Sequence, residues 1–481
     1  MKMRKDSVFF LFCLLFLAAV PVLRASEDPE VIELRRRVAE LEKQNQQILQ
    51  MLQELKARLP EKQAAAASPV PRPSEPARPG ESQAPAKPPA PSALAVVATP
   101  PAAKAADDTV RWAELTSSPS HLKFYGFLRV DNVVDDSRMN NPQSVMWVLP
   151  EDRAAGSADL ANFTLYPRLT RFGINFSGPM VAALGNAKLS GQLEIDFQNG
   201  GSESRPTPRI RHGWLKLTKG NFAFLGGQTW DIFGPLFPTP NTDTLMWNVG
   251  NVGDRRPQLQ ATYSPQAGKG QFLLAGSVGL SSAVDAMDLD ANGYRDGEES
   301  ARPNVEARFG YAHPIRSGGP KVSVGFSGFR GWQSTTRLIA GRRQFYSQGL
   351  AADFEIPFHD RIALRGEGWW GRNMSDFRGG IGQNINTATG VAIRSRGGWA
   401  EFHFKAHRLW TLAPGYTLDD PVDQDVASGG RIRNGSLYFA NRLSLGGGFL
   451  IGADYLHWIT SYKNLPQGTD NRVNIFFQYS F

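Results

Sequence analysis

Cysteine is almost absent from this chain of 481 residues, since Cys13 is the only one. It lies inside an apolar run near the N-terminus, whereas a lipid-modified cysteine would follow such a run, so a lipoprotein is not expected. If this segment is cleaved on export, the mature chain can form no disulfide and has no thiolate for catalysis or metal binding. Disulfide scaffolds and thiolate chemistry are therefore excluded.

Long hydrophobic runs are absent beyond the N-terminus. No later segment offers about 18 consecutive apolar residues, the length with which an α-helix can span a bilayer. An exported chain that ends in a membrane must then cross it as a closed β-barrel, because lipid cannot pair backbone polar groups. This absence favours a barrel.

The chain also lacks a strong charge and a recognisable catalytic pattern. Its formal net charge of +8, which falls to +5 without residues 1–26, is too mild to predict nucleic-acid binding. HExxH, G-x-S-x-G and P-loop patterns are missing. His403 and His407 lie in a stretch that alternates like a strand, which disfavours a helical metal pair. We expect no enzyme, no cofactor and no metal site.

A secretory signal peptide is predicted over residues 1–26. Basic residues precede the apolar run Val8 to Leu23, and the small residues Ala25 and Ser26 follow it. The alternative is a membrane anchor, but a run of about 16 residues is short for a span.

Residues 27–60 are predicted to form a short α-helical coiled coil in the periplasm. Apolar residues recur every seven positions in two series, separated mostly by Glu, Arg, Lys and Gln. Asn45 interrupts the first series and favours a dimer, whereas the mixed Val, Ile and Leu core also permits a trimer. The series are Val31, Val38, Leu52 and Leu59, and Leu34, Leu41, Ile48 and Leu55. Residues 61–106, rich in Ala, Pro and Ser, are predicted to be a semi-rigid linker.

Within residues 107–481 the apolar period switches to two, which indicates β-strands. In the segment 188–198, Leu, Ile and Phe share one face, and Lys, Gln, Glu and Asp share the other. The segment 361–367 repeats the pattern, and its parity places Trp369 inside and Trp370 outside. In a transmembrane barrel the apolar face meets lipid and the polar face meets a watery lumen.

The C-terminal segment distinguishes a membrane barrel from a soluble β-sandwich, whose strands would also alternate apolar and polar residues. Its apolar residues are Val473, Ile475, Phe477, Tyr479 and the terminal Phe481, and only Phe476 interrupts the polar face. This resembles the terminal strand that the outer-membrane barrel assembly machinery reads. About fifteen or sixteen alternating segments are present, and bacterial barrels take even numbers. The predicted fold is therefore all-β, a 16-stranded antiparallel transmembrane β-barrel preceded by the coiled coil.

Candidate pore-lining residues come from polar strand faces and from the long insert Thr229 to Pro257. The insert is expected either to fold into the lumen or to project outward at a subunit interface. The set is Arg171, Arg209, Arg211, Trp230, Arg255, Arg256, Arg308, Arg361, Arg365, Trp369, Lys405 and Arg442. Arg209 and Arg211 are ambiguous, because Leu215 and Leu217 share their parity. Such arginines would favour anions modestly, since carboxylates oppose them.

Acidic residues gather around Gly293, in a segment between predicted strands. They are Asp288, Asp290, Asn292, Asp296, Glu298 and Glu299. Two interpretations of this segment are open: a solvated loop between strands, or a site for Ca²⁺ or for cations that bridge lipopolysaccharide. We take the spacing not to fit the EF-hand template and expect a solvated loop.

Four motifs carry a family resemblance: Tyr125-Gly-Phe-Leu-Arg-Val-Asp, Arg171-Phe-Gly-Ile-Asn-Phe, Gly227-Gln-Thr-Trp and Arg256-Pro-Gln-Leu. With the signal peptide, coiled coil and linker, they resemble the DcaP-like trimeric outer-membrane porins. The resemblance implies a sixteen-stranded barrel in each subunit, a homotrimer, a periplasmic coiled coil and passage of small anionic organic acids. The long Pro/Ala-rich linker and the mixed lumen charges depart from that family.

Two functions are compatible with these features. The first is an outer-membrane porin for passive diffusion of small solutes, with a mild preference for anions such as dicarboxylates. Its expected partners are outer-membrane lipid, lipopolysaccharide, the barrel assembly machinery and a small anionic solute, with no nucleic acid. The second is a structural barrel that tethers the outer membrane to the cell wall through the coiled coil and linker.

Overall fold

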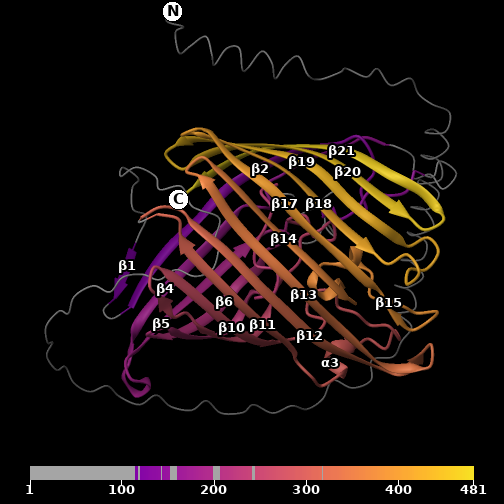
Figure 1. Cartoon of the computed structure of the whole chain (residues 1–481), viewed down its shortest axis with the longest axis horizontal. Coiled ribbons are helices and arrows are strands. Elements are labelled where there is room, and N and C mark those ends of the chain that lie inside the picture. The colour runs from indigo at the N-terminus through magenta and orange to yellow at the C-terminus, as the bar shows by residue number, and fades with distance from the viewer. Residues whose placement is uncertain are drawn as a thin grey trace, which may run out of the picture. The chain divides into compact units, whose positions relative to one another are not determined.

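A computed structural model describes residues 114–117, 120–141, 144–151, 160–198, 206–240, 244–316 and 318–481 (Figure 1). The predicted signal peptide, coiled coil and linker lie outside the described residues. Nearly all regular structure is β-strand. Among the described residues, no helix is long and apolar enough to cross a membrane.

The strands are numbered in chain order, and we give first those of residues 114–316 and then those of residues 318–481. The first group is β1 (Glu114–Ser117), β2 (Ser120–Asp135), β3 (Asn162–Tyr166), β4 (Arg171–Val181), β5 (Ala187–Asp196), β6 (Arg209–Lys219), β7 (Phe222–Trp230), β8 (Arg255–Tyr263), β9 (Gln266–Ala267), β10 (Gly270–Gly279) and β11 (Asn304–Pro314). The second group is β12 (Lys321–Ile339), β13 (Arg342–His359), β14 (Ile362–Arg372), β15 (Ile385–Asn386), β16 (Val391–Ala392), β17 (Arg394–His407), β18 (Trp410–Pro421), β19 (Arg431–Gly446), β20 (Phe449–Tyr462) and β21 (Leu465–Ser480). The short helices are η1 (Ala182–Leu184), α3 (Asp296–Glu299), η2 (Ser375–Phe377) and η3 (Gly380–Gly382).

Antiparallel pairing closes the sheet into a barrel. β2 pairs with β4 on one side and with β21 on the other, so the first and last strands meet. β3 continues the line of β4 along β2. The barrel strands are β2, β4, β5, β6, β7, β8, β10, β11, β12, β13, β14, β17, β18, β19, β20 and β21. The predicted sixteen-stranded antiparallel barrel is confirmed.

The two faces of the strands differ as the period of two predicts. Along β14, the Trp370 side chain is 58% exposed on the outer face, whereas that of Trp369 is 3% exposed inside. On β5, Leu193 is exposed, whereas its neighbour Glu194 is buried. Large apolar side chains thus cover the outside, and charged side chains lie inside, which is the arrangement of a transmembrane barrel.

A β-bulge resolves the ambiguous parity of β6. Ile195 of β5 pairs with Ile210, and Glu194 pairs with His212, so that Arg211 is the extra residue between them. One inserted residue moves every later side chain of the strand to the opposite face. Leu215 therefore points outward, although an even number of positions separates it from Arg211, which points inward. Both arginines of β6 therefore contact interior carboxylates.

The connections differ between the two ends of the barrel. The longest are residues 136–161, 197–208, 231–254, 280–303, 373–393 and 422–430, and all leave the same end. At the other end the links are tight, as between β6 and β7 or between β19 and β20. Outer-membrane barrels place such short turns in the periplasm and the long loops outside the cell.

Phe476, the apolar interruption of the terminal strand, has a structural explanation. Its ring is buried inside the barrel, with the guanidinium carbon of Arg129 3.5 Å from the ring centroid and that of Arg442 4.9 Å away. A cation over a desolvated ring face is stabilised by about 2 kcal/mol. Phe476 thus connects lumen arginines of β2 and β19 to the closing strand.

We expect Phe476→Leu to lower the free energy of unfolding of the barrel by about 1 to 3 kcal/mol, because the two cation–ring contacts are lost. Phe477→Leu is the matched control, since the neighbouring ring lies on the lipid face. Denaturant unfolding in detergent micelles measures both. Equal losses for the two variants would contradict the interior role of Phe476.

Candidate functional site

The connection between β7 and β8 spans residues 231–254, and we call it the inward loop. Its described residues, 231–240 and 244–254, lie against the inner wall of the barrel. Backbone N–H groups of Ile232 and Phe233 donate to Glu306 Oε2 of β11, at 2.9 and 3.1 Å. Farther along, the backbone N–H of Thr239 donates to Glu401 of β17 at 2.8 Å. The loop is therefore fastened to carboxylates of two separate strands.

Arginines of the same wall hold the loop carbonyls. Arg365 of β14 donates to the Phe237 carbonyl at 3.1 Å, and Arg442 of β19 donates to that of Thr239 at 2.6 Å. Hydrogen bonds to charged groups are the stronger ones in proteins. The loop thus folds into the barrel, and of the two sequence-based alternatives the outward position is wrong.

Arg256, directly after the inward loop on β8, joins two loops. Its guanidinium forms ion pairs with Asp231 at 2.7 Å and with Asp376 of η2 at 2.8 Å, and it also donates to the Asp376 carbonyl. The Arg256 side chain is 0% exposed. Arg256 is predicted from the sequence to line the pore, but it is instead a buried clamp between the inward loop and residues 373–393.

Apolar contacts reinforce this clamp. Phe233 of the inward loop meets Phe329 of β12 and Phe377 of η2, with ring centroids 4.8 and 5.5 Å apart. Trp369 packs in the same buried cluster and donates from its indole to the Gly250 carbonyl at 2.7 Å. The predicted inward side of Trp369 is confirmed, and its role is to hold the loop.

A third loop joins the packing inside the barrel. Asn434 of β19 donates to the carbonyls of Met146 and Asn248, both at 2.7 Å, and accepts from the indole of Trp458 at 2.7 Å. Met146 belongs to the connection after β2, and Asn248 belongs to the inward loop. One wall residue therefore holds two loops together.

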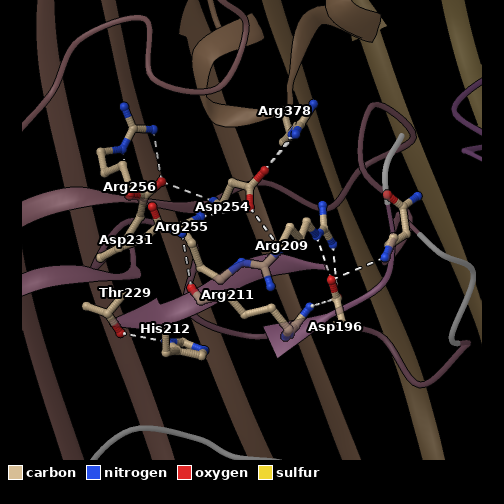
Figure 2. Close-up of polar contacts among 12 residues, drawn as sticks. Asp196, Arg209, Arg211, His212, Thr229, Asp231, Asp254, Arg255, Arg256 and Arg378 are labelled. Carbon is tan, nitrogen blue, oxygen red and sulfur yellow. Dashed lines mark hydrogen bonds and ion pairs between the residues drawn. The ribbon is translucent and has the colours of Figure 1, made fainter. Parts of the chain in front are cut away.

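On the wall formed by β4 to β8, charged side chains gather in what we call the arginine cluster. Figure 2 shows most of them pointing toward one another from the strands and from the loops above. The cluster consists of Arg171, Arg209, Arg211, Arg255 and Arg378 with Glu194, Asp196 and Asp254. Five guanidinium groups thus share three carboxylates.

Short ion pairs define the centre of the cluster. Arg209 and Arg211 contact the two oxygens of Asp196 at 2.7 and 2.9 Å, and Arg211 also reaches Glu194 at 2.8 Å. Arg171 lies 3.5 Å from Glu194. Each guanidinium carries five N–H donors in a planar fork, a geometry that matches the two oxygens of a carboxylate.

The rest of the cluster comes from two loops and from the first residue of β8, Arg255. Arg378 pairs with Asp254 at 2.7 Å, and Arg255 lies 3.4 Å from the same residue. The Arg255 guanidinium covers the rings of Trp230, at 4.5 Å, and Trp247, at 5.9 Å. Trp230 at the end of β7 and Trp247 of the inward loop thus lie against the cationic side chains of the cluster.

The structure divides the twelve residues predicted from the sequence into three groups. Arg171, Arg209, Arg211, Trp230 and Arg255 come together in or beside the arginine cluster. Arg308, Arg365 and Arg442 lie on other strands of the wall, β11, β14 and β19, where Arg308 pairs with Asp353 and Arg442 pairs with Asp454, both at 2.5 Å. Arg256, Trp369, Arg361 and Lys405 belong to neither group.

Two of these residues lie near the short-turn end. Arg361 lies in the turn between β13 and β14, not on the strand predicted for it, because β14 begins at Ile362. Lys405 lies two residues before the end of β17, and its side chain is exposed.

Arg378 is a cluster residue that the sequence did not reveal. It follows η2 in an irregular loop, where no period of two marks the direction of a side chain. Glu401 accepts hydrogen bonds from the inward loop. It could have been found from the sequence, since it lies on the polar face of an alternating strand.

The fold and its interior define a porin-type β-barrel: sixteen antiparallel strands, an apolar outside, and a loop folded into a charged lumen. Among solved structures, the barrel is similar to the outer-membrane channel DcaP of Acinetobacter baumannii, with a TM-score of 0.62 and 17% sequence identity over 77% of this chain and 100% of that one. The predicted resemblance to DcaP-like porins is thus confirmed for the fold.

Other barrels are less similar. The outer-membrane protein OmpT of Vibrio cholerae gives a TM-score of 0.48 at 12% identity, over 77% of this chain and 100% of that chain. OmpF of Salmonella typhi gives 0.47 at 11% identity, over 75% and 98%. No protein-family model matches the sequence, and no curated protein matches it.

Arg256→Gln should release the inward loop, because Asp231 and Asp376 would lose the cation that separates them. Breaking a buried ion pair costs about 3 to 5 kcal/mol. We expect faster proteolysis of the loops and noisier single-channel currents. Arg316→Gln is the control, since its pair with Asp360 is exposed at a turn. Unchanged proteolysis of the Arg256 variant would contradict the clamp.

Proposed function

We propose that this protein is a porin of the bacterial outer membrane through which small solutes diffuse passively. The observation that carries the proposal is the inward loop, which is fastened to both acidic and basic residues of the wall and reduces the cross-section of a barrel with a polar interior. A closed barrel of sixteen strands encloses more space than its own side chains fill. Such an architecture suits a channel whose loop selects solutes by size and charge.

The arginine cluster supports a mild preference for anions. Its five guanidinium groups exceed its three carboxylates by two positive charges, on a wall that is surrounded by lipid of low dielectric constant. Rings of Arg or Lys favour anions in pores. A small dicarboxylate matches the spaced guanidinium groups better than a monovalent anion does, because each carboxylate can accept two parallel N–H bonds.

The proposed assembly is a homotrimer in contact with outer-membrane lipid and lipopolysaccharide. The heptad pattern of residues 27–60 supports self-association through a periplasmic coiled coil, and the family resemblance supports three chains. The apolar terminal strand, which closes the barrel on β2, is the segment for which we propose recognition by the barrel assembly machinery.

Single-channel recording of the purified full-length mature protein tests the channel and the trimer. We expect conductance to appear in groups of three steps in a planar bilayer, and added small dicarboxylates to reduce the current. Deleting residues 27–106 should preserve conductance, because the pore lies in the barrel. A silent bilayer would overturn the proposal and leave a structural role.

Charge selectivity has its own prediction. We expect the reversal potential under a salt gradient to show an anion preference, and the double variant Arg209→Gln with Arg378→Gln to lower the anion-to-cation permeability ratio by about twofold or more. These two substitutions remove the charge surplus of the cluster. Arg316→Gln, outside the lumen, should leave the ratio unchanged. A cation preference of the unmodified protein would contradict the role of the cluster.

A further inference from the structure

The connection between β10 and β11 contains a twelve-residue segment that matches the calcium loop of EF-hands. In the pattern D-x-[DN]-x-[DN]-G-x₅-E, Asp288 takes position 1, Asp290 position 3, Asn292 position 5, Gly293 position 6 and Glu299 position 12. The interpretation made from the sequence, that this spacing does not fit the template, is therefore wrong. Each position that the pattern specifies is occupied by a permitted residue.

The structure brings the acidic side chains of this segment together. Asp288, Asp290 and Asp296 each present a carboxylate oxygen, and these three oxygens lie within 4.8 Å of one another. Asp296 occupies position 9, where EF-hand loops often bind the cation through a water molecule. Three oxygens at this separation can contact one Ca²⁺, whose bonds to oxygen are about 2.3 to 2.6 Å long.

Two buried carboxylate oxygens of the segment are unused. The Asp290 residue is 6% exposed; its Oδ2 accepts from Thr336 and from the backbone of Arg337, but its Oδ1 has no hydrogen-bond partner among the described residues. The same holds for Oε2 of Glu299, whose Oε1 accepts from Asn292. A buried oxygen without a partner is costly, and a bound cation would remove that cost.

The turn of the segment suits a cation. Gly293 has a φ of +88°, which a residue with a side chain adopts only with strain, and its N–H donates to Asp288 at 2.9 Å. Glu299 is the last residue of helix α3, which begins at Asp296, and its Oε1 accepts from the side chain of Asn292 at 2.9 Å. EF-hand loops use an invariant glycine at this position for the sharp turn and the last Glu as a bidentate ligand.

The segment gathers like charges in a small space. Asp296 is buried, and its carboxylate lies beside those of Asp288 and Asp290, which carry the same negative charge. Like charges gathered in this way oppose one another unless a cation or protons compensate them. Ca²⁺ would supply two positive charges at the position where the carboxylates converge.

We propose that residues 288–299 form a Ca²⁺ site in which Asp288, Asp290, Asn292, Asp296 and Glu299 supply side-chain oxygens and Tyr294 supplies its backbone carbonyl. An oxygen-only ligand set of this kind favours Ca²⁺ over Mg²⁺, because Mg²⁺ demands a near-ideal octahedron and usually keeps several of its waters. Sites in extracellular modules bind Ca²⁺ with dissociation constants on the order of 10⁻⁴ M. The site does not depend on whether the barrel conducts.

The position of the site gives bound Ca²⁺ a structural consequence. Just before it in the chain, the backbone N–H groups of Ser282 and Val284 donate to Asp376 at 2.8 and 2.9 Å. Asp376 is the carboxylate that pairs with Arg256 at the end of the inward loop. Ca²⁺ therefore stabilises a segment that is hydrogen-bonded to the clamp between the loops.

Calcium titration of the full mature chain tests the site. The protein is refolded in detergent without lipopolysaccharide, so that cations held by lipid phosphates cannot contribute, and is treated with a chelator before calorimetry. We expect one Ca²⁺ per chain, and Tb³⁺ in the same site should luminesce through Tyr294. Absence of saturable Ca²⁺ binding at millimolar concentrations would overturn the proposal.

Two neighbouring glutamates supply a matched pair of variants. Glu299→Gln removes the ligand of position 12 and should weaken Ca²⁺ binding at least about tenfold, whereas Glu298→Gln removes the same charge from exposed position 11 and should leave it unchanged. Asp290→Asn should repeat the loss. Far-UV circular dichroism verifies that each barrel is folded. Equal weakening by Glu298→Gln and Glu299→Gln would show attraction by general negative charge and would overturn the site.

Discussion

Backbone hydrogen bonding around a closed ring is the constraint on which the rest of this structure depends. A bilayer offers no partners for free N–H and C=O groups, so β2 must pair with β4 on one side and with β21 on the other. Closure imposes alternation on the strands that form it, because successive side chains must face lipid and lumen in turn. It also leaves an interior wide enough to receive whole loops.

Charged residues inside the barrel replace a hydrophobic core. Glu306, Glu401 and Arg365 use their charges to hold the backbone of the inward loop, and Arg256 is completely buried between two carboxylates. Buried charges are costly unless they are paired and hydrogen-bonded, which explains why these lumen arginines have acidic partners. These lumen charges thus have a structural role, and the proposed anion preference depends on the charge surplus of the arginine cluster.

Local patterns predicted the fold but only part of the site. Alternation was sufficient to place Trp369 inside and Trp370 outside, because a strand has one period wherever it is regular. It failed at Arg361, which lies in a turn, and it was ambiguous at Arg211, where a bulge changes the parity. A bulge depends on the register with the neighbouring strand, which no single segment encodes.

The sequence by itself determined the strand count, the lipid and lumen faces, and the twelve-residue acidic pattern, because each of these is a matter of spacing within short segments. Tertiary structure alone decided that the inward loop turns into the barrel, that Arg256 is a clamp, and that Arg378 joins the arginine cluster. These contacts link residues such as Arg256 and Asp376, which are 120 positions apart. These contacts form only when the barrel closes with the correct strand register, so no local sequence pattern predicts them.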